Sequence, residues 1–336
     1  MTANVEFLDD PHDQWQITGR LHQKLLQDKK FDALEISLDR LRDGTARVSD
    51  GDWKYAASIE YLGSVDAEYD DSVLADLVRF LRPSSKDKPW QSRVASLRCW
   101  REAKPTSTAA AVALAQLYFG YAWLARGGNY SDDVPEAAWK VFFSRVRMAS
   151  DVLRSAEQTA NKCPSWYGCS LLAVKADQRE LGQWYAIFER GVSAFPEYWP
   201  TYTSGSDFHL SRWSGSPQQM ADFLKRSITL TNSTAGASVA ARIAWELLNS
   251  YGTTVVDELC EQDWQTIREG FQDWMKLFPR QSVANYFLLT ARVFDDKPTA
   301  RSLIQAIGAT PYPSVWQTHL SAHYQGYGGV RAWAGM

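Results

Sequence analysis

Residues 108–157 read TAAAVALAQLYFGYAWLARGGNYSDDVPEAAWKVFFSRVRMASDVLRSAE, and this stretch decides the fold class of the chain. In its second half, apolar side chains recur at steps of three and four residues, as at Trp139, Phe142, Val146 and Leu153. Charged and polar residues occupy the positions on the opposite face. Because this period matches the turn of an α-helix, it predicts an amphipathic helix that buries one face.

The first half of the stretch, Ala109–Ala125, is the most apolar part of the chain. It is shorter than the roughly 20 residues of a membrane-spanning helix, and Gln116 interrupts it. Gly127 and Gly128 follow, and glycine adopts a positive φ more readily than other residues. We therefore expect a buried core helix, with no membrane span, that pairs with the amphipathic helix as a hairpin.

The rest of the chain shows the same helical periodicity. β-branched residues cluster only at 227–231 and 253–256, which are the best strand candidates, and both are short. The sequence thus predicts an all-α protein of stacked antiparallel helix pairs with short loops. The further expected helices cover residues 15–26, 31–41, 53–62, 72–81, 90–101, 165–177, 182–193, 201–212, 217–229, 237–250, 254–260, 263–277, 282–294 and 299–307.

Three prolines, Pro164, Pro196 and Pro279, follow helical patterns in the same context. Three residues, nearly all apolar or small, stand 12, 8 and 5 positions before each proline, which places them on one helix face. This spacing resembles the second helix of a tetratricopeptide repeat, although Ser170 and Ala173 depart from the first-helix signature. The sets are Val152, Ala156 and Thr159; Trp184, Phe188 and Gly191; and Ile267, Phe271 and Trp274.

The resemblance implies a tetratricopeptide-like α-solenoid with irregular ends. We expect residues 1–105 to form an N-terminal helical region, residues 106–310 the array of helix pairs, and residues 311–336 a C-terminal tail. Whether that tail folds onto the array is left open by the sequence.

A second resemblance rests on YAWLARGGNY at residues 121–130, followed by Val134, Trp139, Phe142 and Arg145. This pattern is similar to that of an uncharacterised bacterial family of tetratricopeptide-like proteins, over roughly residues 25–230. The motifs of that family are structural. The resemblance therefore implies a fold and no reaction.

The composition excludes some classes of function. Lys and Arg number 36 and Asp and Glu 39, so the net charge of −3 disfavours nucleic-acid binding. No cationic stretch followed by an apolar one opens the chain, so we expect a cytoplasmic protein. Four cysteines are too few for a disulfide framework, and we expect buried, reduced thiols.

The sequence shows no phosphate-binding glycine loop, dinucleotide fingerprint or serine nucleophile elbow. His319 and His323 are four residues apart, but the glutamate of the zinc-protease motif is missing and no third ligand can be placed. We expect neither a metal nor a cofactor.

Two enzyme classes stay open as less favoured alternatives. Asp132, Asp133 and Glu136 resemble the acidic motif of class I terpene synthases, whose carboxylates bind Mg²⁺. Asn249, Thr253 and Asp257 match the spacing of the second ligand motif, but Gly252 interrupts it. The 15 tryptophans would also suit a toroidal glycosidase, yet no carboxylate pair stands out.

The favoured function is a non-catalytic protein-interaction module in the bacterial cytoplasm that binds a protein or peptide partner. An immunity or antitoxin-like protein that binds a toxin is a narrower alternative. Aromatic residues and arginine dominate binding hot spots. The candidate binding residues are therefore Trp123, Arg126, Tyr130, Trp166, Tyr167, Trp199, Tyr202 and Trp213.

Overall fold

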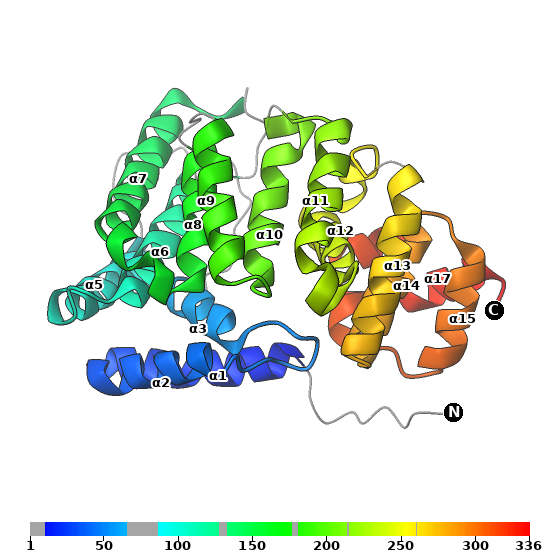
Figure 1. The fold of residues 1–336 in the computed structure, drawn as a ribbon, viewed down its shortest axis with the longest axis horizontal. Coiled ribbons are helices and arrows are strands. Elements are labelled where there is room, and N and C mark those ends of the chain that lie inside the picture. The colour runs from blue at the N-terminus through cyan, green and yellow to red at the C-terminus, as the bar shows by residue number, and fades with distance from the viewer. Residues whose placement is uncertain (1–10, 66–86, 128–132, 177–180, 214, 260) are drawn as a thin grey trace. The chain divides into compact units, whose positions relative to one another are not determined.

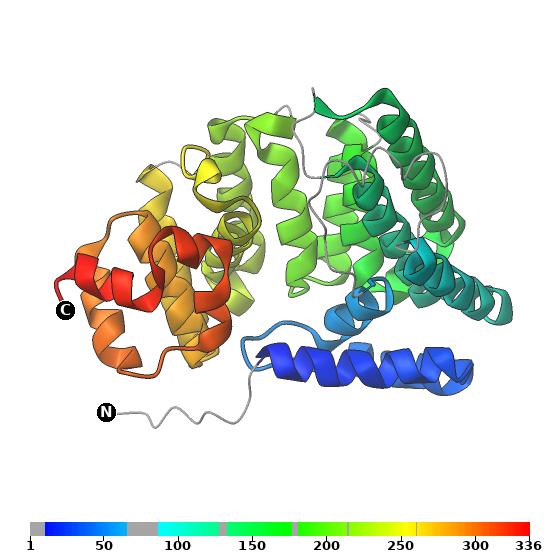
Figure 2. The ribbon, with the colours of Figure 1, turned by 180° about the vertical axis from the view of Figure 1, so that it is seen from behind.

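The computed structural model describes residues 11–65, 87–127, 133–176, 181–213, 215–259 and 261–336 (Figure 1). Throughout these ranges the chain forms helices and contains no strand, so the predicted all-α class is confirmed. Most helices pack in antiparallel pairs with their sequence neighbours (Figures 1 and 2). The expected helix at residues 72–81 lies outside the described residues.

The contacts between Cα atoms divide the chain into two compact units. The first unit contains residues 15–46 and 53–194, and the second contains residues 1–14, 47–52 and 195–336. The expected domain boundaries at residues 105 and 310 each fall inside one of these units.

In the first unit, α5, α7 and α8 all contact α6, which is the central helix. α8 pairs with α9, and α2 with α3. The helices are α1 (Pro11–Gln27, which starts in the second unit), α2 (Phe31–Asp43), α3 (Lys54–Leu62), α5 (Asp87–Ala103), α6 (Thr108–Arg126), α7 (Glu136–Ser155), η2 (Glu157–Lys162), α8 (Pro164–Ala176) and α9 (Leu181–Ala194).

The predicted hairpin is confirmed as α6 and α7. The Ser107 hydroxyl caps α6 by accepting a hydrogen bond from the Ala110 amide at 3.0 Å, and Gly127 ends it with φ 73°. By length and composition α6 could cross a membrane, but 72% of its apolar window is buried inside the protein. Its neighbours cover nearly its whole circumference, which explains why the segment is apolar on all sides.

The second unit is built around α12, which contacts α10, α11 and α13. α14 pairs with α15, and α17 packs on α15. The elements are α10 (Trp199–Ser206), η3 (Asp207–His209), η4 (Ser211–Trp213), α11 (Pro217–Ala235), α12 (Ser238–Tyr251), η5 (Gly252–Val255), α13 (Glu261–Leu277), α14 (Gln281–Val293), α15 (Lys297–Ile307), η6 (Pro313–Gln317), α16 (His319–His323) and α17 (Gly326–Ala334).

Both strand candidates were wrong. Residues 227–231 lie inside α11, and residues 253–256 form a short 3-10 helix and a turn. Ser227 and Thr231 are four residues apart and are both buried on the inner face of α11. The Thr231 hydroxyl donates to the Ser227 carbonyl at 3.1 Å. The weak helix propensity of β-branched residues, a few tenths of a kcal/mol each, is overridden by this packing.

The expected faces ahead of Pro196 and Pro279 are confirmed. Trp184 and Phe188 stack at 5.3 Å in the interior, as do Phe271 and Trp274 at 5.8 Å. The third case differs, because α7 already ends at Ser155 and Pro164 opens α8. Proline suits that first helical position, since the amide it lacks would have no partner there.

The segment 311–336 is folded. The Asn285 side-chain oxygen of α14 accepts hydrogen bonds from the Tyr312 amide at 3.2 Å and from Trp316 Nε1 at 2.6 Å. Arg301 Nε of α15 donates to the Ala334 carbonyl at 2.7 Å. Val330 of α17 is fully buried. The question that the sequence left open is thereby answered: the tail packs on α14 and α15.

Candidate functional site

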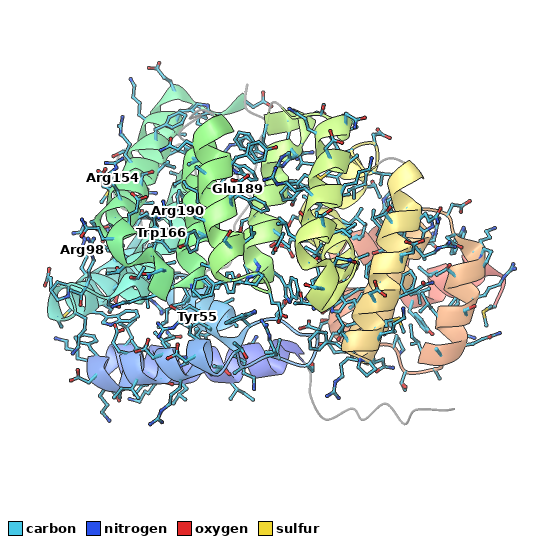
Figure 3. All side chains as sticks on the ribbon, in the orientation of Figure 1. Tyr55, Arg98, Arg154, Trp166, Glu189 and Arg190 are labelled. Carbon is cyan, nitrogen blue, oxygen red and sulfur yellow. The ribbon has the colours of Figure 1, made fainter. Side chains whose placement is uncertain are left out.

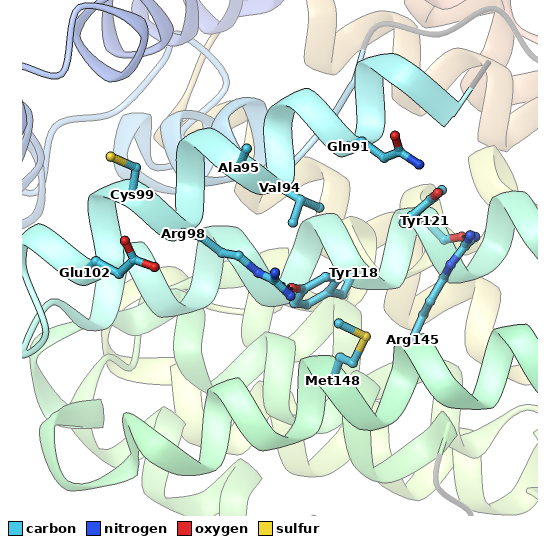
Figure 4. Close-up of a pocket in the computed structure, with 10 residues that line it drawn as sticks. All are labelled: Gln91, Val94, Ala95, Arg98, Cys99, Glu102, Tyr118, Tyr121, Arg145 and Met148. Atoms are coloured by element: carbon cyan, nitrogen blue, oxygen red, sulfur yellow. Dashed lines mark hydrogen bonds between the residues drawn. The ribbon is translucent and has the colours of Figure 1, made fainter. Parts of the chain in front are cut away.

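A groove runs between α5 and α7 in the first unit, and α6 forms its floor (Figure 4). It consists of two adjoining hollows of about 550 and 610 Å³. Both hollows are lined by Arg98, Glu102, Tyr118 and Met148. The first is further lined by Gln91, Val94, Ala95, Cys99, Tyr121 and Arg145, and the second by Arg101, Pro105, Leu114, Asp151 and Val152.

Gly120 allows α5 to lie close to α6 at one end of the groove. A Cβ at Gly120 would lie 2.9 Å from Cη2 of the buried Trp90 of α5. The Trp90 ring stacks on the neighbouring Tyr121 of α6, with centroids 5.5 Å apart. The absence of a side chain at residue 120 thus positions α5 as one wall.

Arg98 of α5 reaches across to the floor. Its Nε and Nη2 both donate to the Tyr118 hydroxyl, at 3.0 and 2.8 Å (Figure 4). Tyr118 is 3% exposed, so its ring belongs to the core while its hydroxyl meets the arginine at the groove. The Arg98 side chain is thereby held in one orientation along the floor.

Arg145 of α7 covers the other tyrosine of the floor. Its guanidinium carbon lies 3.2 Å from the centroid of the Tyr121 ring, and its Nη1 donates to the Tyr121 carbonyl. The Tyr121 hydroxyl in turn donates to Asp87 at 3.0 Å. Burial lowers the pKa of Arg145, while Tyr121 and Asp87 act in the opposite direction. An arginine remains charged under any such shift.

The groove carries an excess of unpaired positive charge. Within the described ranges, Arg98, Arg101 and Arg145 form no ion pair, and neither does Glu102. The other acidic residue of the lining, Asp151, is neutralised by Arg154 at 2.9 Å. Three arginines without a salt-bridge partner therefore face Glu102 along the groove, and Asp87 partly offsets the charge of Arg145.

Trp123 and Arg126, two of the predicted hairpin residues, lie in the last turn of α6 and do not line the groove. Trp123 is 37% exposed, and its ring meets Phe142 edge-on at 5.2 Å. The Arg126 guanidinium lies 5.6 Å from the Trp123 ring and 5.4 Å from the Trp139 ring. Tyr130 lies outside the described residues.

Four of the other predicted binding residues are buried. Trp166 and Tyr167 of α8 are each 3% exposed, and Arg190 of α9 covers the Trp166 ring at 5.7 Å (Figure 3). Trp199 and Tyr202 of α10 are 4% and 0% exposed. These four side chains pack in the interior and present no surface to a partner. Trp213, in η4, is half-buried.

Sequence reasoning missed the groove residues Arg98, Tyr118 and Arg145. One signal was available, since Tyr118 and Tyr121 are three residues apart in an otherwise apolar helix and so share a face. The arginines that meet them come from α5 and α7. The sequence pattern paired α7 with α6, but it did not pair α5 with α6 or indicate which side chains of α7 face the tyrosines.

The terpene-synthase interpretation finds no support in the geometry. α12 ends at Tyr251, and Gly252 follows with φ 63°, so Asn249 and Asp257 do not share one helix face. Over the described residues, no three His, Cys, Asp or Glu side chains converge as metal ligands would. His319 and His323 are exposed on the single turn of α16.

Two cysteines are buried and reduced, as expected. Burial raises the pKa of Cys163 to about 11 and also raises the pKa of Cys169. The Tyr55 hydroxyl donates to Cys163 Sγ at 3.0 Å. Since a thiolate is the reactive form, neither thiol is activated for nucleophilic chemistry. Cys99 is partly exposed on the groove wall, and Cys260 lies outside the described residues.

Residues 21–162 match the family model of a domain of unknown function, DUF4034. The match contains the α6–α7 hairpin and all residues that line the groove. It begins close to the expected residue 25 but ends well before residue 230. No curated protein sequence matches the chain.

Among solved structures, the chain is similar to one described as the human IFIT1 dimer with m7Gppp-AAAA. The sequence identity is 13%, the TM-score is 0.34, and the alignment covers 96% of this chain and 72% of the other. A likeness of this degree supports no conclusion about function.

Proposed function

We propose that this protein is a non-catalytic interaction module whose α5–α7 groove binds an acidic segment of a partner protein. The observation that carries the proposal is the set of three arginines without ion-pair partners, Arg98, Arg101 and Arg145, along one groove. A carboxylate that binds a guanidinium there gains a charge-assisted hydrogen bond, which is about twice as strong as a neutral one.

The groove also offers apolar surface to a partner. Met148 of α7 is 36% exposed although it is a large apolar side chain. Val94, Ala95 and Pro105 add further apolar atoms along the α5 side. Methionine is common at binding surfaces, because its flexible thioether adapts to different partners. An apolar contact flanked by charged groups is typical of protein recognition sites.

A phosphate backbone fits this groove less well than a peptide does. Glu102 faces both hollows without a basic partner. A peptide can place uncharged side chains beside Glu102 and its carboxylates beside the arginines, whereas a nucleic-acid backbone carries a charge at every phosphate. A short single-stranded oligonucleotide such as m7Gppp-AAAA is the competitor that tests the groove for nucleic-acid binding.

The test places a photo-crosslinking amino acid at Ala95, which is exposed and lines the groove. The matched control replaces Ala137, an exposed alanine of α7 that does not line it. Cross-linked peptides from host-cell extract are identified by mass spectrometry, and the partner is then purified. We expect an acidic segment of another protein to cross-link at residue 95. The affinity of the purified partner for this chain should be lower in Arg101→Gln and at high salt.

The proposal is overturned if residue 95 cross-links no more than residue 137 does. It is also overturned if the captured segments are neutral, basic or part of this same chain. Displacement of the purified partner by m7Gppp-AAAA in an Arg101-dependent manner would assign the groove to nucleic acid.

A further inference from the structure

Two arginines approach the groove floor from opposite walls, and each meets its own tyrosine. Arg98 of α5 is bound to the Tyr118 hydroxyl, and Arg145 of α7 lies over the Tyr121 ring. The tyrosines are three residues apart on α6, which corresponds to a rise of about 4.5 Å along the helix. The two guanidinium groups therefore contact side chains of α6 that are about one helical turn apart along the groove.

The first hollow of the groove offers mainly side-chain donors, because all residues that line it lie within α5, α6 and α7. Its walls and floor are the helices α5, α6 and α7, whose main-chain groups are used within each helix. An extended peptide in this groove would desolvate its own amides and carbonyls without gaining partners for them. A helical segment satisfies its own main chain and contacts the groove with side chains alone.

A helix also presents side chains at the required spacing. Residues three or four positions apart on a helix lie side by side, with Cβ atoms about 5–6 Å apart. Two carboxylates at that spacing would meet Arg98 and Arg145. An apolar side chain on the same face would contact Met148, which lies beside Tyr118 in the hollow (Figure 4).

We infer that the groove binds an α-helix of the partner that carries two carboxylates three or four residues apart, one for Arg98 and one for Arg145. This inference rests on the proposed function and specifies the partner's conformation and charge spacing. It also assigns Arg98 and Arg145 as the residues that determine specificity.

The inference can be tested with synthetic peptides of about 20 residues, a length at which alanine-rich helices form in water. The first peptide carries two glutamates at i and i+4 with a leucine on the same face. The second has the same composition with the glutamates at i and i+2, on opposite faces. A third has glutamine at both positions. Circular dichroism is used to match their helicity, and fluorescence anisotropy measures binding to the full chain.

We expect the first peptide to bind about tenfold more tightly than the second or third. Arg98→Gln and Arg145→Gln should each remove most of this preference, and each should couple to one glutamate in a double-mutant cycle. Arg147→Gln, which removes an exposed arginine of α7 outside the groove, should leave it unchanged. Arg98→Lys keeps the positive charge, so it separates the effect of the charge from the effect of losing the hydrogen bonds to Tyr118. Thermal melting of each variant checks that it is folded.

Equal binding of the first two peptides would overturn the inference, and so would tighter binding of an extended, proline-containing acidic peptide. Both results leave the proposed function intact, because an acidic segment still binds. If no acidic peptide binds and no acidic partner cross-links at residue 95, the inference and the proposed function both fail.

Discussion

The Arg242 side chain of α12 is only 4% exposed and donates from Nη1 to the Asp52 carboxylate at 2.8 Å. Its Nη2 donates to the Asp50 carbonyl at 2.8 Å, and its charged plane lies 4.1 Å from the Trp274 ring. Both partners of Arg242 belong to the loop 47–52, which is part of the second unit. A buried arginine with a carboxylate, a carbonyl and an aromatic face thus anchors that loop to α12.

Replacing Arg242 should destabilise the second unit strongly. In Arg242→Ala the Asp52 carboxylate loses Arg242, the Asp50 carbonyl keeps only the donor Trp274 Nε1 at 2.7 Å, and a cavity opens beside Trp274. Because the Asp52 side chain is 55% exposed and can be solvated, the cost comes mainly from the lost packing and the lost hydrogen bond to Asp50, and it is about 2–4 kcal/mol. Urea denaturation followed by circular dichroism should show this loss. Arg212→Ala, which removes an exposed arginine of the same unit, should cost less than about 1 kcal/mol, and equal losses would contradict the anchor role.

Asp50 should make the stability fall as the pH rises. Burial and the neighbouring Asp52 raise the pKa of Asp50 to about 7, while the charge of Arg242 acts to lower it. The Tyr286 hydroxyl also faces the Asp50 carboxyl, at 3.5 Å. The pKa of Asp50 is higher in the folded state than in the unfolded state. The neutral carboxyl therefore stabilises the folded state fully below pH about 4, and this stabilisation is lost as the pH rises to about 7. The loss amounts to up to about 4 kcal/mol.

Unfolding of Asp50→Asn in urea at pH 5 and pH 8 provides the check. The variant should lose less stability over this interval than the wild type does. An identical pH dependence in the two proteins would show that Asp50 is ionised in the folded state.

His209 should make the second unit sensitive to acid. Burial lowers the pKa of His209 to about 4, and its ring stacks on Phe223 at 4.4 Å. Because the folded pKa is depressed, its contribution is present above pH about 6.5 and is lost as the pH falls to about 4. His209→Phe keeps a ring on Phe223 and should reduce this loss by up to about 3 kcal/mol. The NMR titration of the His209 ring gives its pKa directly, and a value near 6.5 would contradict the prediction.

Gly51 should not tolerate a side chain. Its φ is 97°, and a Cβ would lie 2.5 Å from Cε2 of Phe278 and 2.8 Å from Nη2 of Arg242. Gly51→Ala therefore combines backbone strain with a clash, and we expect a loss of about 2–3 kcal/mol. Gly182→Ala is the control, since nothing lies within 4 Å of that Cβ and alanine favours the α9 helix by up to about 1 kcal/mol. Melting temperatures that shift in the same direction for both variants would contradict the prediction.

Asn285 should hold the C-terminal segment on α14. Its side-chain oxygen is the acceptor for both the Tyr312 amide and Trp316 Nε1. In Asn285→Ala these two donors lose their partner, at a cost of about 1–3 kcal/mol. Hydrogen exchange should accelerate at residues 312–316 first, because local opening releases that segment. Protection equal to that of the wild type would show that packing alone retains the tail.

Local patterns predicted much of the fold, and the reason is that helices are local structures. The period of residues 138–153 and the glycine at residue 127 predicted the α6–α7 hairpin, because both act through the nearest turns of the chain. The faces ahead of Pro196 and Pro279 followed from the same periodicity. The strand candidate at residues 227–231 was wrong because Ser227 and Thr231 pack against neighbouring helices, and this packing outweighs the weak helix propensity of β-branched residues. The sequence of residues 227–231 does not show which helices pack there.

The candidate site could not be predicted in this way. Helical periodicity identifies the apolar face of a helix, but it does not show which part of that face the next helix covers. Trp166 and Trp123 were therefore equally good candidates for an exposed binding residue. Packing buried Trp166 and left Trp123 37% exposed.

The sequence by itself determined that this chain forms helices and where the central hairpin begins and turns, and its expectation of buried thiols is met at Cys163 and Cys169 but not at Cys99. Only the tertiary structure decided that Arg98 of α5 and Arg145 of α7, 47 residues apart, meet the same face of α6. It also joined Arg242 to a loop 192 residues earlier in the chain. Helix periodicity reaches only a few turns along the chain, whereas charges that share a groove or a core are brought together by the packing of whole helices.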